Sequence, residues 1–129
     1  RRGILFVDDD PNVLAGLRRV LRPFYYEGEM AFAKNGREAL KLLEHTPFEV
    51  VVTDILMPEL DGLEVIMQLR QSFPAVKIVV ISGGCSWISL NFLEIAKKLG
   101  AHGILLKPFS PRALIEAVRG VLKNQDESR

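Results

Sequence analysis

The sequence predicts an α/β fold in which helices cover both faces of a doubly wound parallel sheet of five strands. The chain has 129 residues, the size of one domain with a single core. Five short apolar runs follow one another along it, and three consist almost entirely of Val, Ile, Leu or Phe. Amphipathic stretches of helical periodicity separate the runs, so the chain repeats a strand–helix unit five times.

The apolar runs define the expected strands. Strands that are covered on both faces must be apolar along their whole length, because neither side chain direction points to water. The expected strands are Ile4–Val7, Met30–Ala33, Val50–Thr53, Val76–Ile81 and Ile104–Leu106.

The stretches between the runs carry helix signals. Asp10 and Pro11 provide an N-cap acceptor and a proline at the first helical position, and Ser110 with Pro111 repeats this arrangement. Gly100 is expected to end the fourth helix, because glycine readily adopts the left-handed conformation found there. The expected helices are residues 11–21, Gly36–His45, Gly62–Gln71, Ser89–Leu99 and 111–122. We expect the domain to cover residues 1–123 and the polar tail, KNQDESR after Leu122, to fray.

Composition excludes several classes of protein. The formal net charge of +1 leaves no basic surplus of the kind that a dedicated nucleic-acid-binding domain uses. The single cysteine, Cys85, excludes an intrachain disulfide, and no apolar run approaches the roughly 18 residues that span a bilayer. We therefore expect a cytoplasmic protein that contacts neither nucleic acid nor membrane. The chain begins with Arg1 and not with Met, which favours a piece of a longer protein.

Polar groups follow four of the five expected strands. Asp8 and Asp9 follow the first strand, Asp54 the third, Ser82 the fourth and Lys107 the fifth. In open α/β sheets, ligands bind beyond the carboxyl ends of the strands. Crowded carboxylates repel one another unless a cation or a raised pKa relieves them, and oxygen ligands suit Mg²⁺. A carboxylate can attack phosphorus, while a lysine and a hydroxyl stabilise the phosphoryl oxygens.

These runs resemble the receiver domains of two-component response regulators. The matching segments extend from about Ile4 to Leu122 and read ILFVDDDPNVL, VVVTDILMPELDG, VVISGG and ILLKPF. The resemblance implies a flavodoxin-like fold with strand order 2-1-3-4-5. It also implies a bacterial signalling switch that receives phosphate from a phosphohistidine on a sensor kinase or a phosphotransfer protein. A phosphorylation-dependent dimer through the fourth helix, fifth strand and fifth helix is a further implication.

The resemblance also assigns roles to single residues. Asp54 is the expected phosphoacceptor, and Asp9 is a stronger candidate for direct metal ligation than Asp8. The expected ligands of Mg²⁺ or Mn²⁺ are Asp8, Asp9, Asp54 and the backbone carbonyl of Leu56. Ser82 occupies the position of the switch hydroxyl, and Lys107 that of the family's lysine.

The sequence departs from the family pattern at two places. Ile104 stands where many receivers carry Tyr or Phe, so we expect any output change to use another element. The segment Gly83–Ser89 is longer than usual and contains Trp87, which forms either a local core plug or a partner surface. Leu56 and Gly84 flank the phosphoryl position, and neither side chain can orient a water molecule by hydrogen bonding.

Other polar residues have simpler interpretations. Asp10 is expected to cap the first helix, and His45 and His102 are expected at or near the surface without a metal role. The arginines of the first helix form either a solvated face or a kinase contact, and they are Arg18, Arg19 and Arg22.

Three alternatives remain open at the level of sequence. The chain is a stand-alone receiver or the N-terminal receiver of a longer regulator, with no output module or dedicated enzyme within it. A metal-dependent phosphohydrolase with an aspartate nucleophile usually carries a second aspartate two residues later, where this chain has Leu56. A receiver-like domain that is never phosphorylated is the third alternative.

Overall fold

The structure is a computed structural model that describes residues 3–21, 30–54, 62–83, 94–107 and 109–127. Its centre is a five-stranded sheet in which neighbouring strands pair in parallel, in the order β2-β1-β3-β4-β5. The strands are β1 (Gly3–Val7), β2 (Met30–Ala33), β3 (Phe48–Asp54), β4 (Lys77–Gly83) and β5 (Gly103–Lys107). The predicted fold class and strand order are therefore confirmed.

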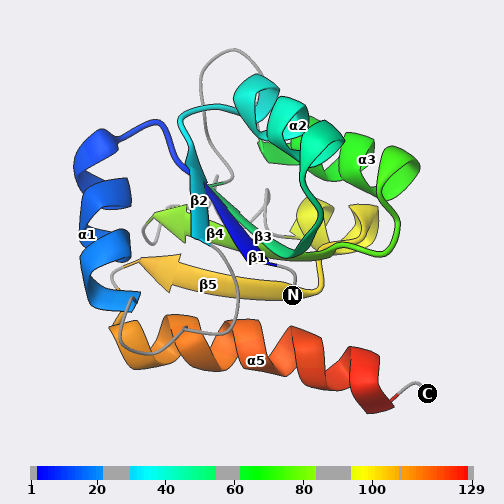
Figure 1. The fold of residues 1–129 in the computed structure, drawn as a ribbon. Coiled ribbons are helices and arrows are strands. Elements are labelled where there is room, and N and C mark those ends of the chain that lie inside the picture. Colours follow the sequence, from blue (N-terminus) through cyan, green and yellow to red (C-terminus); the bar gives the residue numbers. More distant parts are fainter. Residues whose placement is uncertain (1–2, 22–29, 55–61, 84–93, 108, 128–129) are drawn as a thin grey trace.

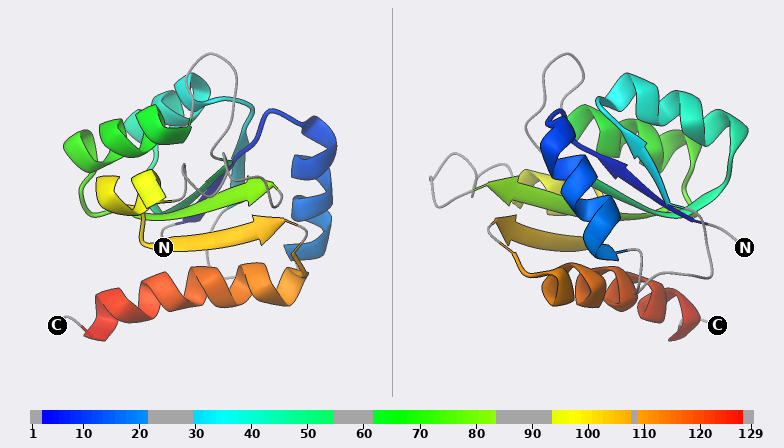
Figure 2. Two further views of the ribbon diagram at one scale, coloured as in Figure 1. Left: turned by 180° about the vertical axis from the view of Figure 1, so that it is seen from behind. Right: turned by 60° about the vertical axis from the view of Figure 1, so that its left-hand side comes forward.

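Helices cover both faces of the sheet (Figures 1 and 2). α1 (Pro11–Leu21) and α5 (Pro111–Glu127) lie on one face. α2 (Gly36–His45), α3 (Gly62–Ser72) and the helical residues 94–99 lie on the other. This arrangement explains why the central strands are apolar on both sides.

The core has two halves, one on each face of the sheet, and successive strand residues alternate between them. Val51 packs on the α2–α3 side, whereas Val50 and Val52 pack on the α1–α5 side, and all three are almost fully buried. The same alternation sends Leu5 to the first side and Phe6 to the second. Apolar side chains of the same strand thus pack into both halves of the core.

Capping residues position the helices that follow β1 and β5. The backbone N–H of Asn12 donates to Asp10 Oδ1 at 2.9 Å, and that of Ala113 donates to Ser110 Oγ at 3.0 Å. Gly100 has a φ of 120° and its N–H donates to the carbonyl of Ala96 at 3.1 Å. Both predicted N-caps and the predicted glycine stop are therefore confirmed.

Several predicted boundaries differ from the structure. β3 begins two residues earlier than expected, at Phe48, because backbone pairing with β1 extends beyond the apolar run. Val76 is buried but lies in the turn after α3, where its N–H donates to the carbonyl of Phe73 at 3.1 Å. α5 continues to Glu127, five residues beyond its predicted end at Leu122, and the expected fraying of the tail stays a prediction. Residues 89–93 of the expected fourth helix lie outside the described residues.

Candidate functional site

Three carboxylates meet at the carboxyl edge of the sheet. Asp8 directly follows β1, and Asp54 is the last residue of β3, the strand that pairs with β1. One carboxylate oxygen from each of Asp8, Asp9 and Asp54 lies within 4.8 Å of the others. Residues 46 positions apart in sequence are thus brought together because parallel strands end at the same edge.

Asp8 is the buried member of this acidic cluster, with only 3% of its surface exposed. Its backbone N–H donates to the carbonyl of Ala33 at 3.0 Å, and its Oδ1 accepts from the N–H of Asp10 at 2.9 Å. Burial raises the pKa of Asp8, and repulsion from Asp54 and Asp9 adds to this. The Asp10 amide and the Lys107 ammonium group act in the opposite direction without cancelling the effect. The folded protein therefore disfavours the charge on Asp8.

Lys107 supplies the positive charge of the site. Its Nζ donates a hydrogen bond to Asp54 Oδ2 at 3.2 Å and lies 3.6 Å from Asp8 Oδ2. Burial opposes the charge on this amine, but attraction by Asp54 and Asp8 outweighs it and the pKa of Lys107 is raised. Lys107 is therefore a cation at physiological pH, held against two carboxylates.

Ser82 brings a hydroxyl group to the same edge. Asp54 pairs with Ile81 of β4, the residue before Ser82, and Lys107 pairs with Gly83, the residue after it. Ser82 is fully buried, and its Oγ has no hydrogen-bond partner among the residues that the structure describes. A buried hydroxyl without a partner costs free energy and is uncommon in folded proteins. Its unused donor is available to a group bound beside Asp54.

The described site unites Asp8, Asp9, Asp54, Ser82 and Lys107, all of which were singled out from sequence. Such a set can hold a divalent cation through hard oxygen ligands and can surround a phosphoryl group with a lysine and a hydroxyl. Ile104, the departure on β5, is half-buried and packs with the α2–α3 side of the core. Its proposed consequence for output stays a prediction.

Several residues considered from sequence lie outside the described part of the chain. They are Arg22, Leu56, Gly84, Cys85 and Trp87. The predicted carbonyl ligand from Leu56 and the two alternatives for Trp87 therefore stay predictions.

The two histidines differ from each other. His45 is exposed, as expected. His102 is half-buried, and its Nδ1 accepts a hydrogen bond from the backbone N–H of Ile78 at 3.0 Å. A half-buried position agrees with the expectation for His102, but its partner 24 residues away was not predicted, because no signal near it in sequence points to Ile78.

The arginines of α1 also differ from each other. The guanidinium carbon of Arg18 lies 4.5 Å from the centroid of the Phe32 ring, which stacks on Phe6 with 5.3 Å between centroids. Arg18 therefore contacts the adjacent strand, whereas no such ring contact is recorded for Arg19 among the described residues. Arg18 is exposed, which agrees with a solvated face, and one side of its guanidinium group lies over the Phe32 ring.

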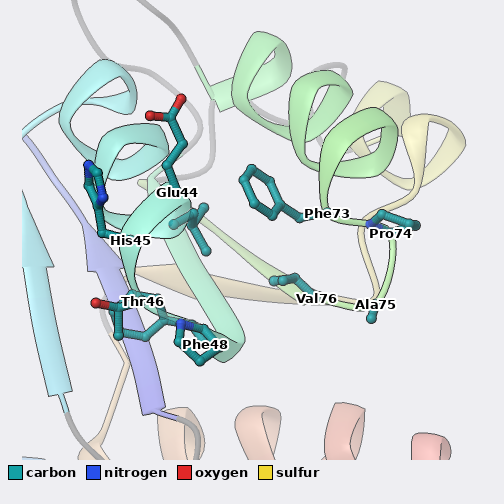
Figure 3. Close-up of a pocket in the computed structure, with 10 residues that line it drawn as sticks. Glu44, His45, Thr46, Phe48, Phe73, Pro74, Ala75 and Val76 are labelled. Carbon is teal, nitrogen blue, oxygen red and sulfur yellow. The ribbon is translucent and has the colours of Figure 1, made fainter.

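A pocket lies at the opposite edge of the sheet, where β3 and β4 begin. It has a volume of about 410 Å³ and lies between the ends of α2 and α3 (Figure 3). Phe48, Phe73 and Val76 form part of its apolar wall, and Glu44 and His45 stand at its border. It contains none of the residues of the acidic cluster, so the chemistry described above does not belong to it.

None of the helices among the described residues is long and apolar enough to cross a membrane.

Comparison with known proteins agrees with this geometry. The family model described as "Response regulator receiver domain" matches residues 4–119. The response regulator MprA of Mycolicibacterium vanbaalenii is 38% identical over 120 residues, which cover 93% of this chain and 50% of MprA. The chemotaxis protein CheY of Thermotoga maritima is 34% identical over 123 residues, which cover 93% of this chain and 97% of CheY. The chain thus spans about half of MprA and nearly all of that CheY.

Solved structures show the same architecture. A CheY-like receiver domain protein from Methanospirillum hungatei superimposes with a TM-score of 0.86 at 28% identity, covering 99% of this chain and 98% of the other. A signal receiver domain of an HD domain-containing protein from Pseudomonas fluorescens gives 0.87 at 27% identity, covering 98% and 99%. With the matched family model and the arrangement at the strand ends, these similarities show that the chain belongs to the response regulator receiver domains, the phosphoacceptors of two-component signalling.

Proposed function

We propose that Asp54 accepts the phosphoryl group, from a phosphohistidine on a sensor kinase or a phosphotransfer protein. The observation that carries this proposal is the position of Lys107, whose Nζ contacts Asp54 and Asp8 while all three carboxylates of the cluster lie within 4.8 Å. Asp54 ends its strand at this point, so it presents its carboxylate at the edge where ligands of α/β sheets bind.

The acidic cluster fits a resident Mg²⁺ or Mn²⁺ ion. Asp8, Asp9 and Asp54 offer the hard oxygen ligands that these ions prefer, and Leu56 would add its backbone carbonyl by analogy with the family. The raised pKa of buried Asp8 supports the same assignment, because a divalent cation relieves the repulsion that contributes to it. When bound, the ion would neutralise negative charge on the phosphoryl oxygens.

The remaining groups act on the transferred phosphoryl group. A carboxylate oxygen of Asp54 attacks phosphorus, the P–N bond to the donor imidazole breaks, and the donor nitrogen keeps the electron pair. Lys107, already a cation beside Asp54, stabilises the charge on the equatorial oxygens. Ser82 Oγ, which has no other partner among the described residues, donates a hydrogen bond to the bound phosphoryl group.

The domain acts as a switch and not as a dedicated enzyme. Its similarity to about half of MprA supports a receiver within a longer regulator, and its similarity to nearly all of a CheY supports a stand-alone receiver. A cytoplasmic location, a kinase or phosphotransfer partner and a dimer formed on phosphorylation complete the proposal. Neither nucleic acid nor membrane is proposed as a direct partner of this domain.

Mass measurement tests the phosphoacceptor. Incubation with a small phosphodonor and Mg²⁺ should add one phosphoryl group, and Asp54→Asn should abolish the gain. Asp9→Asn should lower the apparent affinity for Mg²⁺ by at least about tenfold, because loss of a ligand should cost no less than loss of a residue that only supports a ligand. Asp10→Asn is the matched control, because Asn also caps helices and Asp10 holds the start of α1.

Two results would contradict the proposal. A phosphoryl group that is still gained by Asp54→Asn would place the acceptor elsewhere. Sustained release of phosphate from small phosphate esters would favour the phosphohydrolase alternative.

A further inference from the structure

The start of β5 is joined to the start of β4 by a reciprocal pair of hydrogen bonds. The backbone N–H of His102 donates to the carbonyl of Ile78 at 2.8 Å. In return, the N–H of Ile78 donates to Nδ1 of the His102 ring at 3.0 Å. Regular pairing of the two strands begins only one residue later, between Val79 and Gly103. The imidazole therefore takes the place of a backbone carbonyl and extends the sheet by one hydrogen bond.

This arrangement requires a neutral ring. A nitrogen that accepts a hydrogen bond carries no proton, so the proton of the neutral imidazole is on Nε2. Protonation would place an N–H at Nδ1 directly opposite the N–H of Ile78, and the hydrogen bond would be lost. The bond is thus present in one protonation state and absent in the other.

The surroundings oppose the charged ring. Burial lowers the pKa of His102 below its usual 6.5, and repulsion from Lys77 and Arg70 lowers it further. Lys77 is the first residue of β4, and Arg70 reaches over from α3 and donates to the carbonyl of Pro74 at 3.1 Å. The helical residues 94–99 add two further cations, Lys97 and Lys98, both of which are exposed.

Arg70 is itself held in this place by Gly100. A Cβ at Gly100 would lie 2.9 Å from Cδ of Arg70, so the arginine packs directly on the backbone of the turn that leads to His102. The positive charge of Arg70 is therefore held near the His102 ring by packing. A proton on His102 would be added beside Lys77 and Arg70, and among the described residues no carboxylate is found to act on the ring.

We propose that His102 is a pH-sensitive latch, in which the neutral imidazole closes the amino end of the β4–β5 pair and its protonation opens it. The turn of residues 100–102 leads directly into β5, whose last residue is Lys107. Opening the latch thus loosens the beginning of the strand that carries the lysine of the phosphoacceptor site.

The direction of the pH effect follows from the lowered pKa. The unfolded chain takes up a proton near pH 6.5 and the folded chain only at lower pH. The stability that the neutral ring provides is therefore complete above 6.5 and is lost as the pH falls through the folded pKa. Asp8 has a raised pKa and acts in the opposite direction, so variants must be compared at the same pH.

His102→Asn is the decisive variant. The Asn Oδ1 can accept the Ile78 hydrogen bond as Nδ1 does but does not titrate in this range. We expect the fall in Tm between pH 7.5 and 5.0 to be smaller in His102→Asn than in the natural chain. His45→Asn, which removes the exposed histidine, should leave that fall unchanged. His102→Leu, which removes the acceptor, should lower Tm at pH 7.5 and have a smaller effect at pH 5.0, where protonation weakens the same hydrogen bond in the natural chain.

A local measurement completes the test. Amide hydrogen exchange, corrected for intrinsic rates, should show protection of the Ile78 amide falling by roughly three- to tenfold on acidification, the net value of one hydrogen bond. This change should be absent in His102→Asn. NMR titration should show the His102 ring with a proton on Nε2 at neutral pH. An unchanged Ile78 amide together with equal pH profiles for His102→Asn and the natural chain would overturn the proposal.

Discussion

The two edges of the sheet differ in how their polar groups are satisfied. At the carboxyl edge, buried Asp8 has a raised pKa, Ser82 Oγ has no partner among the described residues, and Lys107 lies between two carboxylates. At the amino edge, His102 is neutral and exchanges two hydrogen bonds with Ile78. At the carboxyl edge Ser82 Oγ thus lacks a partner among the described residues, whereas at the amino edge the polar groups of His102 and Ile78 are paired with each other.

The difference indicates that the two edges of the sheet have different roles: the carboxyl edge carries the groups proposed to react, and the amino edge contributes to stability. Groups that must act on a phosphoryl group and a metal ion cannot be fully satisfied by the protein beforehand, and their burial costs free energy. The apolar strands between the two edges offset that cost through core packing on both faces. Substitutions at the carboxyl edge should therefore reduce activity without reducing stability.

The largest effect is expected for Lys107→Met. It removes the cation that we propose stabilises the transferred phosphoryl group, so the rate of phosphoryl gain should fall by about 10²- to 10³-fold. The time course of the mass increase at fixed phosphodonor measures it. Lys77→Met at the amino edge is the matched control and should keep the natural rate. Equal losses in both variants would show that the effect is general and not local to the site.

Asp8→Asn should stabilise the metal-free protein. The pKa of Asp8 is raised above its usual 3.8, so the protonated side chain contributes its full stability below pH 3.8. That stability is lost as the pH rises through the pKa of the folded state. At pH 7 the ionised carboxylate therefore destabilises the fold. A neutral amide should add about 1.5 kcal/mol to the free energy of unfolding, despite the lost contact with Lys107. Urea unfolding with a chelator measures this.

The free energies of unfolding of the natural chain and of Asp8→Asn should also be compared after Mg²⁺ is added. Mg²⁺ should stabilise the natural chain more than Asp8→Asn, because the variant lacks one of the proposed ligands. If Asp8→Asn were less stable than the natural chain in the chelator, the contact with Lys107 would outweigh the burial of the charge.

Ser82→Ala and Thr53→Val compare two buried hydroxyls. Thr53 Oγ1 donates to the backbone carbonyl of Asp54 at 3.0 Å, whereas Ser82 Oγ has no partner among the described residues. Thr53→Val should lower the free energy of unfolding by about 1 kcal/mol, while Ser82→Ala should leave it unchanged or raise it by a similar amount. Chemical denaturation without Mg²⁺ measures both free energies of unfolding. A clear decrease for Ser82→Ala would show that the Ser82 hydroxyl does have a hydrogen-bond partner.

The smallest effect is expected on α1. Arg18→Ala removes the contact with the Phe32 ring and should cost about 0.5 kcal/mol of unfolding free energy. Arg19→Ala, on the same helix, should cost less. If both variants unfold alike but transfer from a kinase is slower in each, the arginines of α1 would act through partner binding alone.

Much of the fold follows from local sequence. Continuous apolar strands and capped amphipathic helices repeat along the chain, and hydrophobic periodicity records which side chains must be buried. Strand limits were less accurate, because pairing with a neighbour extended β3 back to Phe48 and a turn held Val76 outside β4. Those limits depend on backbone partners that local composition does not describe.

The candidate site divides in the same way. Its residue types and their places after the strands could be predicted, since motifs at strand ends keep their order in sequence. The electrostatics could not, because the contact between Lys107 and Asp54 joins residues 53 positions apart and depends on their final geometry. The latch at His102 and the position of Arg18 over Phe32 have no local signal at all. Sequence by itself thus determined the fold and the residue types at the strand ends, whereas tertiary structure decided which charges are buried and which are paired, because those energies depend on distance and burial.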